Sequence, residues 1–177
     1  FMASIGYDLY VKLLNQAIAV EKGEEIKTEK SDCLIDITVD AYIPEKYIPY
    51  TQNRIESYKR IASLENEEDV SDLLDELIDR YGDVPQSVMG LIDISLLRVM
   101  ASSVGIYEVV QRKDLLMFYS QDFAKVDMAY VLKNTKHKLA VSAAAKPYIS
   151  AQIKNGESSL EVMKDMLNLF KESSQQK

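Results

Sequence analysis

Residues 66–85 read NEEDVSDLLDELIDRYGDVP, and this stretch decides most about the fold. Its apolar side chains recur every three or four positions, which predicts an amphipathic helix over residues 67–81. They are Val70, Leu73, Leu74, Leu77, Ile78 and Tyr81. Asn66 is suited to cap this helix, because its side chain can accept a hydrogen bond from the first turn. Gly82 favours the end of the helix, and Pro85 favours the start of the next one.

The segments before this helix predict a strand, a loop and further helices. Cys33 to Val39 alternates apolar and polar residues, which is typical of a half-buried strand. Two prolines then predict an irregular loop, which neighbouring tyrosine and isoleucine side chains should hold to the core. Amphipathic helices are expected from Tyr7 to Val20 and over residues 52–64, and a third helix over residues 85–104 follows the quoted stretch.

The second half of the chain predicts two strand pairs and two helices. A hairpin is expected over residues 106–111 and 115–119, a short helix over 126–134, and a second strand pair over 139–143 and 148–153. The last helix should begin at Ser158, which has capping-box spacing to Glu161. Because helices and strands do not alternate regularly, we expect an α+β fold with antiparallel strand pairs packed with a cluster of helices, not a Rossmann fold.

The composition indicates a chain that folds without metals or disulfides. It has 177 residues, of which 47% are hydrophobic, and one cysteine, Cys33, which we expect to be buried. The six glycines are isolated, so no phosphate-binding loop is present, and we expect neither a cofactor nor ATP hydrolysis in this chain. The one histidine, His137, is expected in a solvated loop. No catalytic or metal site is predicted, and the lack of a membrane span or signal peptide favours the cytoplasm.

The net charge of −7 is unevenly distributed. Residues 21–83 contain 18 acidic and 8 basic residues, whereas residues 84–177 contain 9 acidic and 12 basic residues. An acidic surface, such as residues 21–83 would form, repels phosphate backbones, so it favours a basic protein partner over nucleic acid. The acidic residues concentrate on the outer side of the predicted helix 67–81, where the candidate protein-interaction residues are Asp72, Asp75, Glu76, Asp79 and Arg80. A solvated acidic surface without a partner is the alternative.

Three separate stretches carry a resemblance to a known family. They are residues 41–49 (AYIPEKYIP), 53–62 (NRIESYKRIA) and 75–85 (DELIDRYGDVP). In order and spacing they resemble the C-terminal domain of the bacterial transcription-repair coupling factors, the Mfd family. The stretch DELIDRYG differs from the family motif only by Tyr81 where the family has phenylalanine. The likeness becomes weaker in the second half of the chain.

The resemblance implies a non-catalytic regulatory domain of an ATP-dependent DNA translocase, which displaces stalled RNA polymerase and recruits nucleotide excision repair. The domain would dock on a UvrB-like N-terminal module of the same protein and mask the surface that binds UvrA. ATP and DNA would be bound by the parent protein. On this interpretation, residues 1–30 join the domain to the preceding motor, residues 31–172 form the regulatory domain, and residues 173–177 are a polar tail.

Two alternatives follow from the residues. The lysines of the second half could contact nucleic acid and help the translocase hold DNA; they are Lys133, Lys136, Lys138 and Lys146. The chain could also be an independent hydrolase, although its single histidine offers no obvious triad.

Overall fold

The computed structural model describes residues 33–176 and forms two compact units within that range. One unit contains residues 39–96, and the other contains residues 33–38 together with 97–176. The boundary falls within helix α4 (Gln86–Ser103). The predicted N-terminal helix and the linker of residues 1–30 lie outside the described residues, and the predicted domain of residues 31–172 stays a prediction.

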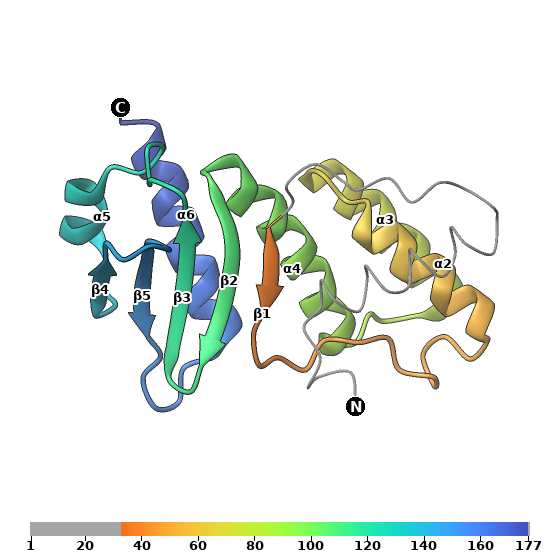
Figure 1. The fold of residues 1–177 in the computed structure, drawn as a ribbon. Coiled ribbons are helices and arrows are strands. Elements are labelled where there is room, and N and C mark those ends of the chain that lie inside the picture. The colour runs from red at the N-terminus through yellow and green to blue at the C-terminus, as the bar shows by residue number, and fades with distance from the viewer. Residues whose placement is uncertain (1–32, 177) are drawn as a thin grey trace. The chain divides into compact units, whose positions relative to one another are not determined.

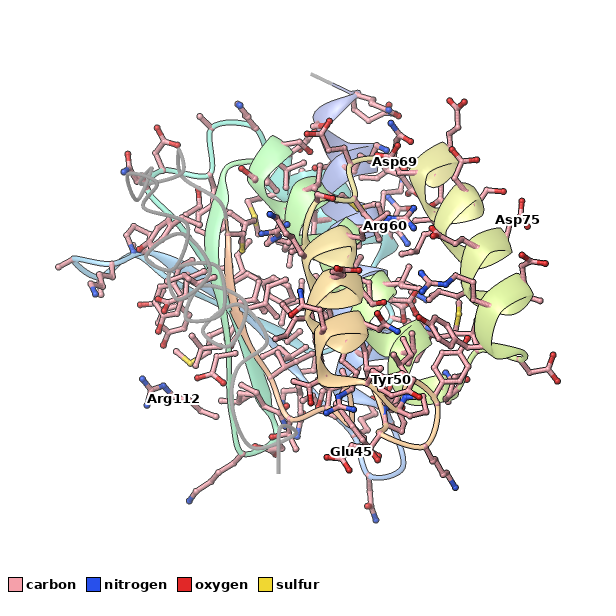
Figure 2. All side chains as sticks on the ribbon, turned by 90° about the vertical axis from the view of Figure 1, so that its right-hand side faces the viewer. Glu45, Tyr50, Arg60, Asp69, Asp75 and Arg112 are labelled. Atoms are coloured by element: carbon pink, nitrogen blue, oxygen red, sulfur yellow. The ribbon has the colours of Figure 1, made fainter. Side chains whose placement is uncertain are left out.

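The first unit is helical. Helix α2 (Thr51–Ala62) and helix α3 (Glu67–Tyr81) lie side by side, and α4 begins in the same unit (Figures 1 and 2). The hydroxyl of Ser95 on α4 donates a 2.6 Å hydrogen bond to the carbonyl oxygen of Ile61 on α2. The loop packs against α4 near Gly90, where a Cβ would lie 3.5 Å from the Cβ of Ala41, an ordinary van der Waals contact.

The loop before α2 is held to the core as predicted. Ile43 and Ile48 are buried, while Tyr42 and Tyr47 are half-buried. The backbone N–H of Ile43 donates a 2.8 Å hydrogen bond to the hydroxyl of Tyr58 on α2. These contacts fix the irregular segment from which α2 begins.

The second unit contains a five-stranded sheet in the order β1-β2-β3-β5-β4. The strands are β1 (Leu34–Asp36), β2 (Ile106–Arg112), β3 (Leu115–Ser120), β4 (Leu139–Ser142) and β5 (Tyr148–Gln152). Helix α5 (Met128–Asn134) precedes β4, and helix α6 (Ser159–Ser174) lies along one face of the sheet (Figure 1). The rings of Phe118 on β3 and Phe170 on α6 meet edge to face, with centroids 5.3 Å apart.

The α+β class is confirmed, but one pairing differs from the prediction. Strands β2, β3, β5 and β4 pair antiparallel, whereas β1 pairs parallel with β2, with Ile35 opposite Val109. A parallel pair needs a long connection, and the three helices α2, α3 and α4 lie between β1 and β2 in the chain. The alternation of apolar and polar residues in β1 predicts a strand, but it does not show which other strand β1 pairs with.

Three local predictions have clear outcomes. Cys33 is buried, as expected for a small apolar side chain. Ser158 caps α6 by accepting a hydrogen bond from the backbone of Glu161. Ser173 and Ser174, which were predicted to belong to the polar tail of residues 173–177, lie in α6, and Ser173 is buried.

Among the described residues, the structure contains no helix with both the length and the apolar character needed to cross a membrane.

Candidate functional site

Helix α3 begins with the cap that the sequence predicts. The side-chain oxygen of Asn66 accepts a 2.8 Å hydrogen bond from the backbone N–H of Asp69. The carboxylate of Asp69 accepts a 3.0 Å hydrogen bond from the backbone N–H of Glu65, the residue before the cap. The first bond satisfies a donor that the first turn would leave free, and the second holds the chain that leads into the helix. They fix where α3 begins, and therefore which of its side chains face outward.

The buried stripe of α3 is narrower than predicted. Val70, Leu73 and Leu77 are buried, and the last two are only 1% and 3% exposed. Ile78, which was expected in the same stripe, is 51% exposed. At about 100° per residue, Ile78 lies a quarter-turn or more from the stripe. The prediction that Ile78 is buried was wrong because it counted the apolar character of this residue and did not consider its angular position around the axis of α3.

The five candidate residues fall into two groups on α3. Asp72, Asp75 and Asp79 lie opposite the buried stripe and are exposed. Figure 2 shows Asp75 on the side of α3 that faces away from α2. Ile78 borders these carboxylates on the side away from Glu76. We call the set Asp72, Asp75, Ile78 and Asp79 the outer face of α3.

Glu76 belongs to the second group because it is held inside the unit. Its carboxylate forms an ion pair with Arg60 of α2, and it lies 3.6 Å from the guanidinium of Arg80 one turn further along α3. Arg60 projects from α2 on the side next to α3 (Figure 2). The Glu76 and Arg60 side chains are 41% and 47% exposed. Glu76 therefore ties α3 to α2 and also pairs with Arg80 on its own helix, and the sequence offered no signal that Arg60 would be the partner.

A tyrosine pair closes the C-terminal end of α3. The hydroxyl of Tyr47 donates to the carbonyl oxygen of Gly82 at 3.0 Å and lies 3.3 Å from that of Leu77. Gly82 has a φ of +84°, which a glycine adopts without strain. The centroids of the Tyr47 and Tyr81 rings lie 5.7 Å apart. Burial, followed by the nearby Asp83 and Tyr81, raises the pKa of Tyr47, which favours the protonated hydroxyl that donates to Gly82.

The histidine of the second unit is not where the sequence placed it. His137 is buried, and its Nε2 lies 3.0 Å from a carboxylate oxygen of Asp165 on α6. Its Nδ1 lies 3.8 Å from Glu157. Partial burial disfavours the charged form of Asp165, but hydrogen bonds from His137 and Lys136 outweigh that effect and lower its pKa. The prediction of a solvated loop histidine was wrong, because the distant carboxylates on and near α6 cannot be seen in the local Lys-His-Lys sequence.

The four lysines that the sequence grouped together differ in their ion pairs. All four lysines are exposed, but Lys136 lies 3.2 Å from Asp165, whereas Lys133, Lys138 and Lys146 have no ion pair within the described residues. In the part of the chain that the structure describes, no group of three histidine, cysteine or acidic side chains is arranged to hold a metal ion. The nucleic-acid and hydrolase alternatives stay predictions.

The described chain is thus an α+β domain whose most distinctive exposed chemistry is an acidic helix surface with one apolar residue. A family model, the TRCF domain, matches residues 37–131, and the chain belongs to this family of transcription-repair coupling factors. The resemblance found in the sequence is confirmed. The match ends within α5, so β4, β5 and α6 lie beyond it.

Curated relatives and a solved structure agree with this assignment. The transcription-repair-coupling factor of Bacillus subtilis is 36% identical over 128 residues, which are 72% of this chain and 11% of the relative. That of Staphylococcus epidermidis is 38% identical over 114 residues, or 64% of this chain and 10% of the relative. The chain therefore spans about a tenth of these relatives. A crystal structure of the C-terminal domain of a transcription-repair coupling factor shares the fold, with a TM-score of 0.71 and 24% identity over 82% of this chain and 93% of that one.

Proposed function

We propose that this chain is a regulatory docking domain of a transcription-repair coupling factor, and that the outer face of α3 is its contact surface. The observation that carries the proposal is the arrangement of Asp72, Asp75 and Asp79 around the exposed Ile78, on a helix anchored by other residues. The partner would be the UvrB-like N-terminal module of the same protein. Docking there would mask the surface that binds UvrA.

The physical basis of docking is charge complementarity with an apolar anchor. Carboxylates make their strongest hydrogen bonds with arginine and lysine, so a basic partner surface fits the three aspartates. Ile78 would lose exposed apolar area on docking, which contributes binding free energy that a purely charged surface lacks. Because α3 is already fixed by its cap and by Glu76, little conformational entropy is lost when the partner binds.

In the parent protein this contact would hold a closed state. The parent would be an ATP-dependent DNA translocase of the cytoplasm that displaces stalled RNA polymerase and recruits nucleotide excision repair, with ATP and DNA bound outside this domain. A coupling free energy of about 1 to 3 kcal/mol would favour the closed state and still allow polymerase and DNA to open it. Opening would then expose the surface for UvrA. The domain itself would act through binding, with no catalytic residue or cofactor of its own.

Calorimetric titration of this chain with the UvrB-like module tests the contact. Asp75→Asn combined with Asp79→Asn should weaken binding by about tenfold or more, because both lost charges lie on the outer face. Glu76→Gln is the control: it removes one charge from α3, against two in the double variant, and it does so at a residue already paired within the unit. Equal weakening by both changes, or by neither, would contradict the assignment of the outer face.

Deletion of the domain from the full-length parent tests the regulation. We expect a higher basal ATPase rate and tighter UvrA binding, because the closed state would no longer form. The doubly substituted parent should show the same direction of change with the domain still present. Unchanged ATPase activity and unchanged UvrA binding after deletion would refute an inhibitory role, whatever the titration shows.

A further inference from the structure

Strand β4 (Leu139–Ser142) is an edge strand of the sheet in the second unit, and neither a charged residue nor a proline interrupts it. It pairs with β5 on one side only, at the end of the strand order (Figure 1). From residue 139 to 145 the sequence is LAVSAAA, without charge or proline. Natural sheets protect exposed edges with charges, prolines or bulges, because a free edge can pair with another chain. This edge is therefore open to strand addition.

The backbone of β4 presents unpaired groups toward the open side. The carbonyl of Lys138 accepts a 3.0 Å hydrogen bond from the N–H of Gln152, and Ala140 is opposite Ser150 on β5. Because the N–H and C=O of a strand alternate in direction from residue to residue, those of Leu139 and Val141 point away from β5. Among the described residues the structure gives these two no other backbone partner. Val141 is also 56% exposed.

The segment leading into β4 is held in place, so the edge is preformed. The buried His137 is bonded to Asp165 of α6, and its backbone N–H donates a 3.0 Å hydrogen bond to the hydroxyl of Thr135. These contacts fix the residues immediately before Leu139. A preformed edge costs little entropy when a second strand pairs with it.

The charges beside β4 indicate what kind of segment it would accept. Lys138 directly precedes the strand and Lys146 follows the alanines, and both are exposed and unpaired within the described chain. In an antiparallel pair of two β4 strands, the start of one strand would lie beside the end of the other, so Lys138 of one copy would approach the turn that carries Lys146 of the other. The two positive charges repel each other, so self-pairing is disfavoured. A segment with acidic residues at its ends would meet these lysines favourably instead.

We propose that the β4 edge binds, by β-strand addition, an extended peptide segment with a short uncharged centre and acidic residues at both ends. Backbone hydrogen bonds to Leu139 and Val141 would provide the pairing, and Lys138 and Lys146 would select the acidic ends. This surface lies beyond the residues matched by the family model and does not depend on docking through α3.

The test uses the full 177-residue chain and a fluorescein-labelled peptide, Asp-Glu-Val-Thr-Val-Thr-Val-Glu-Asp, with binding followed by anisotropy. Val141→Pro removes the outward N–H without removing a bond to β5, and should weaken binding by about tenfold or more. Val141→Thr keeps the N–H and is the matched control, with a change below about twofold. Circular dichroism melting of each variant shows that the fold is retained.

A charge exchange tests selection without altering the strand. Lys138→Glu combined with Lys146→Glu should abolish binding of the acid-ended peptide and allow binding of the same centre with lysine ends. The proposal is overturned if the wild-type chain binds neither peptide at millimolar concentration, if it binds both equally, or if Val141→Pro has no effect. It is also overturned if sedimentation shows a dimer that Val141→Pro abolishes, or if a labelled oligothymidine binds through the same lysines and displaces the peptide.

Discussion

The ion pair between Arg60 and Glu76 decides how the acidic helix should be interpreted, so its energy is the first quantity to measure. Both side chains are nearly half exposed, at 47% and 41%. Exposed pairs of this kind couple by about 0.2 to 1 kcal/mol, and a pair at i, i+4 within a helix adds about 0.3 to 0.5 kcal/mol. Glu76→Gln removes the ion pairs with both Arg60 and Arg80. We therefore expect it to lower the free energy of unfolding by about 1 kcal/mol.

A double-mutant cycle isolates the part that belongs to Arg60 and Glu76. Urea unfolding of the wild type, Arg60→Ala, Glu76→Gln and the double variant should give a coupling free energy of about 0.5 kcal/mol at low salt. The coupling should fall in about 1 M salt, where the screening length is roughly 3 Å. An equivalent cycle between Arg60 and Asp75 should give no coupling, because Asp75 lies on the far side of α3 (Figure 2).

Two results would refute the reasoning. A coupling free energy indistinguishable from zero would mean that Glu76 is free to bind a partner, as the sequence alone suggested. Coupling as predicted, together with loss of docking in Glu76→Gln at a temperature where the chain is fully folded, would mean that the ion pair opens on docking. In either case Glu76 would have to be included in the contact surface.

Three further predictions concern stability. Leu73→Ala should cost about 2 to 5 kcal/mol because Leu73 is 1% exposed, whereas Ile78→Ala should change the urea midpoint little. Asn66→Ala should cost about 1 kcal/mol by removing the cap of α3, and Asn66→Asp should restore it. Asp165 has a lowered pKa in the folded chain, so its contribution to stability is complete above its ordinary value of about 3.9 and is lost as the pH falls below it. Asp165→Asn should therefore flatten the acid limb of a pH–stability profile measured by urea unfolding.

Most of the fold could be predicted from local patterns. Asn66, Gly82 and Ser158 mark helix boundaries through local backbone chemistry, and the structure places those boundaries within a residue of the prediction. The position of the strands in the second half also followed from alternation and turn residues. Local signals suffice where the physical cause lies within a few residues of its effect.

Apart from the burial of Ile78, the errors arose where the cause is distant in sequence. The buried His137 is bonded to Asp165, which lies 28 residues further along the chain, and Glu76 is paired with Arg60 from a different helix. Neither partner is marked by spacing or residue type. The candidate residues on α3 were correctly placed on its polar side, but only the packed unit separates those that stabilise the helix pair from those left exposed.

The parallel pairing of β1 with β2 has a consequence for folding and for dissecting the chain. Leu34 meets Glu108 only after the whole helical unit has been traversed, so closing this contact costs more chain entropy than forming the β2–β3 hairpin. We expect β1 to join the sheet last and to leave it first. The helical unit is, in sequence, an insertion between the first strand and the rest of the sheet. A fragment that starts at residue 37, where the family match begins, would leave β2 with an unpaired edge and acquire the aggregation risk that β1 prevents.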